Sequence, residues 1–324
     1  MTDKIVARIL REIGVADLLD VLGEKLAPTD LQSLLLSVFR LRAAHQTPRR
    51  VLEQYEQSAF VRPSTVDVGA LLELDGLALG LAVPLFEPVE LSPLAPLGTS
   101  SALAPVDQNK VVATIRNTEV VSDSTNVLAL ECALRRRAQR RGATYSQDVV
   151  RLCASHRLVR AQQYKDPSLR AHFRMFALCT GGRGDIDGKF VAASLKEQID
   201  FYLRFLALVA KHGYHLSGVR IAFTPLAGDR EREQLQQQVI LPLAEQFPEV
   251  RLEFDPNPTT TSGYYELVRF QVYATDLQGV EYMIGDGGFN DWTQKLLSDR
   301  RERLLTSGIA TERMVALFRR NAMD

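Results

Sequence analysis

Apolar residues recur at helical spacing through the first part of the chain. The segments "TDLQSLLLSVFRLRAAHQ" (29–46) and "PRRVLEQYEQSAF" (48–60) each carry an apolar stripe, and residues 3–25 show the same period. The pattern predicts a small helical appendage over residues 1–66. Its apolar faces need a partner, which is either the rest of the chain or another protein.

From residue 67 onward, alternating segments are mixed with long helical ones. The sequence predicts amphipathic helices at 125–142 and 189–214 and a hairpin at 263–292 that leads into a Gly-rich loop. We further expect Pro-rich extended chain at 83–106, paired strands at 109–121, strands at 148–164 and 169–182, a strand at 217–226, a helix at 229–247, and a strand followed by the final helix near the end. Hairpins together with long helices predict an α+β domain over residues 67–324, in which helices flank an antiparallel sheet.

Composition narrows the function classes only moderately. Lys and Arg total 39 and so do Asp and Glu, so no global field favours nucleic acid or an anionic membrane. The three cysteines and five histidines show no metal-ligand spacing, and we expect buried free thiols and no metal site. The start is charged and amphipathic, and the longest apolar run (77–86) is too short to cross a bilayer. We therefore expect a cytoplasmic protein without membrane contact.

Two groups of charged residues need an explanation. In "TSGIATERMVALF" (306–318), Ser307 and Gly308 suit a turn and the apolar residues from Ile309 onward suit a buried helix face. Arg313 at the start of that helix needs a partner, either a carboxylate such as Asp286 or Asp291, or a bound anion. The second group is the arginine cluster 135–141, which is either a surface for RNA or phosphate or a favourable charge at a helix C-terminus.

Six short segments occur in a fixed order along the predicted α+β domain. They are "LFEPVELSP" (85–93), "VVSDST" (120–125), "VRAQ" (159–162), "SGYYELVRF" (262–270), "GGFNDW" (287–292) and "GIATER" (308–313). Their order and spacing resemble the catalytic core of class II aminoacyl-tRNA synthetases. Within that class they resemble the histidyl branch, which includes the synthetase-like regulatory subunit of ATP phosphoribosyltransferase.

The resemblance implies a site for an amino acid. Asp123 and Thr125 match the positions that hold the amino group of the amino acid, and an ammonium indeed prefers a carboxylate and a hydroxyl acceptor. The same two residues also suit an N-cap at the start of helix 125–142, and both interpretations stay open. Tyr264 and Tyr265 match the tyrosine pair of a signature of the histidyl branch.

The resemblance also implies a site for ATP, with or without Mg²⁺. Arg160 would hold the α-phosphate and the carboxylate, and Gln162 would accept a hydrogen bond from the adenine amino group. Arg313, at the start of the third class motif, would hold the γ-phosphate next to a helix N-terminus. The alternative for Arg160 is an exposed arginine on an edge strand.

Departures from the family pattern bear on activity. Thr260 stands where the histidyl branch has a catalytic arginine, and Arg269 is a candidate substitute. We equate Arg174, Leu178 and Phe289 with positions that read the histidine ring, and they are poorly suited to an imidazole. The chain ends soon after Arg313, so we expect no anticodon-binding domain and do not expect tRNA as a ligand.

Two functional hypotheses follow. The first is a catalytically degenerate paralogue of histidyl-tRNA synthetase that binds a nucleotide, an amino acid or both, and acts through a protein partner as a regulatory subunit does. The second is an active ligase that adenylates an amino acid or a related acid and transfers it to an acceptor other than tRNA. Exchange of pyrophosphate into ATP separates them. For either, we expect a homodimer through the surface around "LFEPVELSP", and the N-terminal helices as the site for any protein partner.

Overall fold

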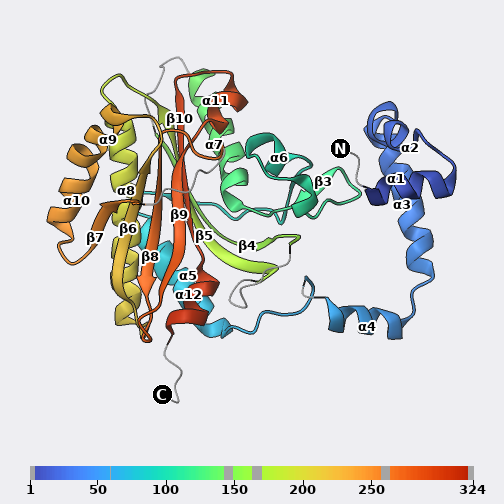
Figure 1. Cartoon of the computed structure of the whole chain (residues 1–324), viewed down its shortest axis with the longest axis horizontal. Coiled ribbons are helices and arrows are strands. Elements are labelled where there is room, and N and C mark those ends of the chain that lie inside the picture. The colour runs from blue at the N-terminus through green and yellow to red at the C-terminus, as the bar shows by residue number, and fades with distance from the viewer. Residues whose placement is uncertain (1–3, 59, 142–148, 163–169, 257–262, 320–324) are drawn as a thin grey trace.

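The computed structural model describes residues 4–58, 60–141, 149–162, 170–256 and 263–319. From residue 68 onward the elements surround a central sheet, and the helices before it lie to one side of this body (Figure 1).

The first helices form an arm that extends away from the body (Figure 1). They are α1 (Lys4–Ile13), α2 (Leu18–Asp20) with the π-helical turn η1 (Val21–Lys25), α3 (Pro28–Ala44) and α4 (Pro48–Gln57). At the start of α4 the Thr47 hydroxyl accepts a hydrogen bond from the Arg50 amide, ahead of the Pro48 that suits a first turn. Within residues 4–58 no residue is buried, and Ile5 and Leu41 are 59% and 63% exposed. The arm is helical, but its apolar side chains stay open to solvent.

The body is built on an eight-stranded sheet with the order β1-β4-β5-β10-β9-β8-β6-β7. The outermost pairs, β1 with β4 and β6 with β7, are parallel, and every pair between them is antiparallel. The strands are β1 (Glu87–Pro88), β4 (Val150–Val159), β5 (His172–Arg183), β6 (Ser217–Pro225), β7 (Arg251–Phe254), β8 (Val268–Thr275), β9 (Glu281–Asn290) and β10 (Glu302–Ile309). A separate ribbon pairs β2 (Leu94–Pro96) with β3 (Thr118–Val120). The mostly antiparallel sheet flanked by helices confirms the predicted α+β class.

Helices cover both faces of the sheet (Figure 1). One face packs against α5 (Val68–Ala82), α8 (Lys189–Lys211), the continuous run α9 (Asp229–Leu235), η3 (Gln236–Ile240) and α10 (Leu241–Gln246), and α12 (Thr311–Phe318). The other face packs against α6 (Thr99–Leu103), α7 (Ser124–Arg141) and α11 (Trp292–Leu297), and the short 3₁₀ turn η2 (Gln108–Lys110) follows α6 in the chain.

Strand alternation assigns side chains to these two cores. On β5, Phe176 and Leu178 lie in the core under α5 and α8, whereas Met175, Ala177 and Cys179 lie on the α7 side. Period-two alternation with both faces covered explains the unbroken apolar run from Met175 to Cys179 in β5.

Several expectations of local structure were wrong. Helix α5 was not predicted, because its apolar residues surround the whole helix and leave no polar face to mark the period. The predicted Gly-rich loop after the hairpin is part of strand β9, where close packing from both faces leaves room only for glycine at several positions. Ser307 to Ile309 belong to β10 and not to a turn or the final helix. The paired strands expected at 109–121 reduce to β3 and one isolated bridge.

Glu312, next to Arg313, joins the arm to the body. This carboxylate is 3% exposed. It accepts hydrogen bonds from the Ser64 hydroxyl and from the Arg174 amide at 3.0 Å, and it pairs with the Arg157 guanidinium at 2.7 Å. His172 adds a contact at 2.7 Å to the Arg62 carbonyl. The buried charge at the start of α12 therefore anchors the linker that precedes α5.

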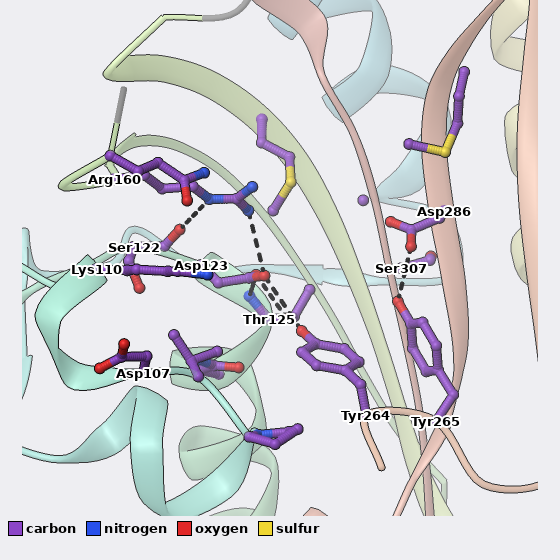
Figure 2. Close-up of a pocket in the computed structure, with 17 residues that line it drawn as sticks. Asp107, Lys110, Ser122, Asp123, Thr125, Arg160, Tyr264, Tyr265, Asp286 and Ser307 are labelled. Atoms are coloured by element: carbon purple, nitrogen blue, oxygen red, sulfur yellow. Dashed lines mark hydrogen bonds and ion pairs between the residues drawn. The ribbon is translucent and has the colours of Figure 1, made fainter. Parts of the chain in front are cut away.

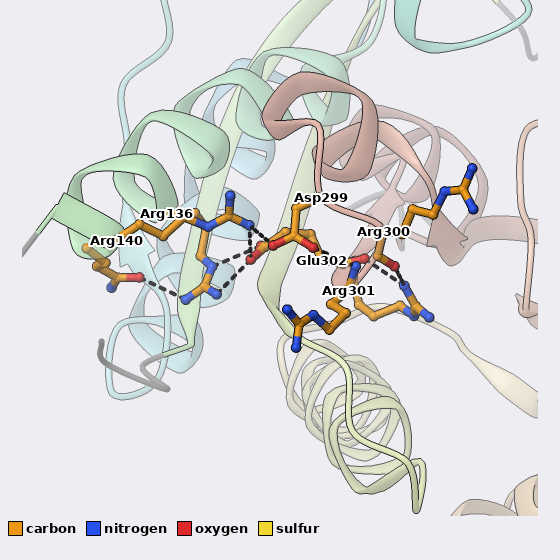
Figure 3. Close-up of polar contacts among 8 residues, drawn as sticks. Arg136, Arg140, Asp299, Arg300, Arg301 and Glu302 are labelled. Atoms are coloured by element: carbon orange, nitrogen blue, oxygen red, sulfur yellow. Dashed lines mark hydrogen bonds and ion pairs between the residues drawn. The ribbon is translucent and has the colours of Figure 1, made fainter. Parts of the chain in front are cut away.

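Three arginines of the cluster form ion pairs within the fold. Arg136 and Glu302 are 1% and 0% exposed and form a two-point ion pair at 2.9 and 3.0 Å between α7 and β10 (Figure 3). Arg140 contacts Asp299 at 2.7 Å and Glu302 at 2.8 Å, and Arg135 pairs with Glu131 and Glu87. These arginines connect α7 to the sheet rather than forming one continuous surface for phosphate.

Candidate ligand-binding site

A cavity of about 520 Å³ opens on the α7 face of the sheet. Six of the seven residues that the sequence singled out line it: Asp123, Thr125, Arg160, Gln162, Tyr264 and Tyr265. They come from the start of α7, the end of β4 and the segment before β8, so the fold brings together residues that are far apart in the chain (Figure 2). Their functional roles stay predictions.

Asp123 organises one side of the cavity. Its Oδ1 accepts hydrogen bonds from the Thr125 amide at 3.0 Å and the Thr125 hydroxyl at 2.7 Å. Its Oδ2 accepts from the Tyr264 hydroxyl at 3.3 Å and lies 3.7 Å from the Arg160 guanidinium. Both interpretations from the sequence are thus compatible with the structure, because the same carboxylate caps α7 and also faces the cavity.

Arg160 lies directly after β4, at the cavity edge. Its Nε donates to the Ser122 carbonyl at 3.1 Å, and its guanidinium lies 5.0 Å from the centre of the Phe173 ring. The Arg160 amide donates to the Ala171 carbonyl at 2.8 Å, which continues the β4–β5 pairing. These contacts fix the side chain against the wall, so the cation is held at a defined place beside Asp123.

A second carboxylate, Asp286 on β9, lies on the other side of the cavity (Figure 2). The Tyr265 hydroxyl donates to it at 3.4 Å, and Arg269 lies 3.5 Å away. Burial raises the pKa of Asp286, Arg269 opposes that shift and the negative charge of Asp123 adds to it. Burial also raises the pKa of Tyr264 and Tyr265 well above the usual tyrosine value, so both hydroxyls remain hydrogen-bond donors.

Glycine makes room for the second tyrosine. A Cβ on Gly288 would lie 2.6 Å from the Tyr265 ring and 2.6 Å from the Val268 carbonyl oxygen. Tyr264 packs in turn against Trp292, with ring centroids 5.3 Å apart. The Gly-rich strand β9 and α11 therefore set the positions of the two tyrosines.

Arg313 is not among the residues that line the cavity. Its guanidinium donates to the Met283 carbonyl at 3.0 Å and lies 5.7 Å from the centre of the Tyr282 ring. Arg313 therefore contacts the backbone of a lining residue, Met283, without lining the cavity itself. The carboxylates named as alternative partners contact other cations, Asp286 with Arg269 and Asp291 with Lys295.

The assumption about histidine-reading positions was wrong. Arg174 pairs with Asp75 of α5 at 2.6 Å, and Leu178 and Phe289 lie in the core on the α8 side. All three point away from the cavity, because they lie on the face of the sheet that α5 and α8 cover. They carry no information about its selectivity.

Several lining residues were not predicted from the sequence, among them Asp107, Lys110, Asn126, Met175 and Asp286. Asp286 was considered only as a possible partner of Arg313, since it stands in "IGDGG", where no local pattern marks a site. Strand alternation can place Asp286 on the cavity face only once the strand pairing is known. In the structure, Asp286 lies opposite Gly308 on β10 and Gln271 on β8. Thr260, the departure that argued against catalysis, falls outside the described residues.

Comparison with solved structures assigns the fold. No protein-family model matches the sequence, and no curated protein matches it either. The structure is similar to an ATP phosphoribosyltransferase regulatory subunit/histidyl-tRNA synthetase from Bacillus halodurans, with a TM-score of 0.56 and 14% identity over 80% of this chain and 82% of that one. It is also similar to a histidine–tRNA ligase subunit from Alicyclobacillus acidocaldarius, with a TM-score of 0.53 and 14% identity over 80% of this chain and 96% of that one.

A third similar structure is the histidyl-tRNA synthetase of S. aureus, with a TM-score of 0.53 and 11% identity over 76% of this chain and 64% of that one. The body of this protein therefore has the class II aminoacyl-tRNA synthetase-like fold. The structural similarity establishes the fold, and at identities this low the activity stays open.

Membrane-spanning helices and clustered metal ligands are both absent from the described part of the chain. None of the helices described there is long and apolar enough to cross a membrane. Among the same residues, no group of three or more His, Cys, Asp or Glu side chains comes together as a metal site.

Proposed function

We propose that this chain binds an amino acid in the cavity and acts through a protein partner, as a catalytically degenerate, regulatory-subunit-like relative of histidyl-tRNA synthetase. The observation that carries the proposal is the geometry at Asp123. Its carboxylate is held by Thr125 and Tyr264 and faces a cavity that also presents the Arg160 guanidinium. A carboxylate beside a fixed guanidinium suits the ammonium and carboxylate ends of a zwitterion.

The charge of the lining favours an amino acid over a triphosphate. The described lining residues include the carboxylates Asp107, Asp123 and Asp286 and the cations Lys110 and Arg160. A triphosphate needs an excess of cations, and Arg313, the residue expected at the γ-phosphate, is not a lining residue and donates to the Met283 carbonyl. ATP, with or without Mg²⁺, is retained as a second ligand to be tested, with Arg160 and Gln162 as its nearest lining residues.

The same geometry bears on catalysis. Attack of a carboxylate on the α-phosphate brings like charges together, so an adenylating enzyme needs cations placed in advance. Arg269, the substitute considered for the missing catalytic arginine, lies 3.5 Å from Asp286 and is not a lining residue. These features support ligand binding without efficient adenylation. The fixed Arg160 beside Gln162 supports the alternative, an active ligase with an acceptor other than tRNA.

Calorimetry with a panel of the twenty amino acids, ATP and AMP tests the proposal. We expect one group of amino acids to bind wild type and Asp123→Asn to weaken that binding by about 10–100-fold, because a charge-assisted hydrogen bond is lost. Asp187→Asn, at an exposed surface ion pair with Lys189, is the matched control and should bind as wild type does. If no amino acid binds, the proposal is wrong.

Exchange of labelled pyrophosphate into ATP, with the same amino acids, separates the two hypotheses. We expect no exchange above background. Exchange with any amino acid would establish the ligase alternative instead.

For the partner, the arm is the surface that supports the proposal. Its helices leave Ile9 41% exposed and Phe39 53% exposed, and such surfaces are seldom left uncovered in water.

A further inference from the structure

Two consecutive tyrosines each hold one carboxylate of the cavity. The Tyr264 hydroxyl donates to Asp123 at 3.3 Å and the Tyr265 hydroxyl donates to Asp286 at 3.4 Å. Their rings meet edge to face, with centroids 4.7 Å apart, so neighbouring residues reach opposite sides of one space (Figure 2). The cavity therefore contains two similar acidic subsites, and the proposed amino group uses only the one at Asp123.

The contacts at Asp286 are long. A carboxylate offers about four acceptor positions. The hydrogen bonds found for Asp286 are those from Tyr265 at 3.4 Å and from Arg269 at 3.5 Å, both longer than the usual distance. Arg269 lies on the same face of the sheet and balances the charge, but it is not a lining residue. The acceptor capacity of Asp286 toward the cavity is left for a ligand.

The environment of Asp286 favours a cationic ligand group. Partial burial raises the pKa of this carboxyl, and the negative charge of Asp123 adds to the shift. A positive group on a ligand would lower that pKa again and would stabilise the ionised carboxylate.

A third polar group in the cavity independently indicates a ligand. Asn126, at the start of α7, lines the cavity and is 1% exposed. Within the described residues, both its amide nitrogen and its amide oxygen lack a hydrogen-bond partner. Buried amides are rarely left unsatisfied, so a polar ligand group is the expected partner. Met175 and Met283 supply flexible apolar lining of the kind that packs against a methylene chain.

We infer that the ligand of this cavity carries two amino groups, as in a diamino acid: one amino group binds at Asp123 and Tyr264, and the other at Asp286 and Tyr265. The methylene chain between them packs on Met175 and Met283, and the carboxylate lies toward Arg160 and Asn126. This inference rests on the proposed amino-acid site and adds the class of side chain that the site selects.

Calorimetry on the full wild-type chain provides the first test, with ligand pairs that differ in one charge. The diamino acids are lysine, ornithine and 2,4-diaminobutyrate, and the matched neutral ligands are norleucine and Nε-acetyl-lysine. We expect at least one diamino acid to bind about tenfold or more tightly than both neutral ligands, because a desolvated ion pair is lost in them. Equal or tighter binding of the neutral ligands would overturn the inference.

Asp286→Asn, which keeps the shape of the side chain, assigns the preference to this subsite. The variant should bind diamino and neutral ligands within about twofold of each other. Asp123→Asn should instead weaken both kinds of ligand together. A preference for diamino acids that survives in folded Asp286→Asn would also overturn the inference.

A crystal structure of wild type with the tightest diamino acid covers the case in which Asp286→Asn does not fold. An amino group within hydrogen-bond distance of the Asp286 carboxylate is expected, and a side chain directed elsewhere contradicts the inference. The two proposals fail in different ways. Absence of any amino-acid binding defeats the proposed function, whereas binding without a charge preference defeats only the second subsite.

Discussion

At the scale of single residues, Gly288 tests whether the tyrosine pair is held by the sheet. An alanine Cβ there would lie 2.6 Å from both the Tyr265 ring and the Val268 carbonyl oxygen. We expect Gly288→Ala to lower the free energy of unfolding by about 1–3 kcal/mol, as overpacking does, and to weaken ligand binding by displacing Tyr265. Urea unfolding followed by the fluorescence of Trp292, the one tryptophan of the chain, measures the first effect.

Gly76→Ala is the matched control. Gly76 is exposed in α5, and a Cβ added there would meet no atom within 4 Å, so alanine should stabilise the protein by about 0.5–1 kcal/mol. Equal effects at both glycines would mean that Tyr265 does not depend on the close approach of β9.

Individual residues also show which parts of the site could be predicted from the sequence. Asp123, Thr125, Arg160 and Gln162 were found because the resemblance carries them in order, and they line one cavity. The expected convergence of Arg313 on that cavity depended on its side-chain direction. A side chain at the start of a helix that follows a strand can point in several directions. Here the Arg313 guanidinium donates to the Met283 carbonyl. Side-chain direction across a sheet needs the strand pairing, which no local pattern contains.

At the scale of elements, Glu119 on β3 secures the segment that forms one wall of the cavity. This carboxylate is 1% exposed and accepts hydrogen bonds from the Gly98 and Ser100 amides, the Ser100 hydroxyl and the Gln108 side chain. Burial alone would raise the pKa of Glu119, but the hydrogen bonds from Ser100, Gln108 and Gly98 outweigh it and lower the pKa from its ordinary value. Gln108 lies between the lining residues Asp107 and Lys110.

The sign of that shift fixes a pH dependence. Because the pKa is lower in the folded protein, the stabilisation is present above the unfolded-state pKa of about 4.3 and is lost as the pH falls through the folded-state value. We expect Glu119→Gln to lower Tm at pH 7, and the difference from wild type to shrink below about pH 4. Thermal unfolding across pH 3–7 checks this, with the exposed Glu249→Gln as control. A difference that does not change with pH contradicts the role of the ionised form.

The pair Arg136–Glu302 makes a second prediction about elements. It joins α7 to β10 with both side chains at or below 1% exposure. Glu302→Leu removes the carboxylate that pairs with the buried Arg136 and should cost about 3–5 kcal/mol of unfolding free energy. Arg136→Met should cost less, because Glu302 keeps its contact with Arg140 at 2.8 Å. The double variant should be more stable than Glu302→Leu, because two apolar groups restore a neutral interior. Urea unfolding of the three variants measures this, and additive losses would contradict it.

At the scale of the whole molecule, the arm and the body differ in how far their apolar residues are buried. The body has two apolar cores on the faces of one sheet, while the described arm residues include none that is buried. The helical period of the arm could be predicted from the sequence, because an amphipathic helix depends only on the spacing of apolar residues within its own segment. What covers the apolar side of the arm could not be predicted, because that depends on the shape of a second surface that packs against it. The linker contacts at Glu312 hold the base of the arm and leave its helices accessible.

The predicted homodimer uses a different surface from the arm, so the two can be tested separately. Leu85, Leu94 and Leu97, around the segment equated with the first class motif, are 46%, 40% and 45% exposed. We expect the full chain to have twice its mass of 36.2 kDa by light scattering after gel filtration, and Leu94→Glu/Leu97→Glu to have the mass of one chain, because a charge at a paired apolar surface is costly. Leu277→Glu, at a leucine of the β8–β9 turn that is 65% exposed, should remain a dimer. A dimer that survives the double substitution but is lost with Ile5→Glu/Ile9→Glu would instead assign self-association to the arm, and the arm would then not be a free site for another protein.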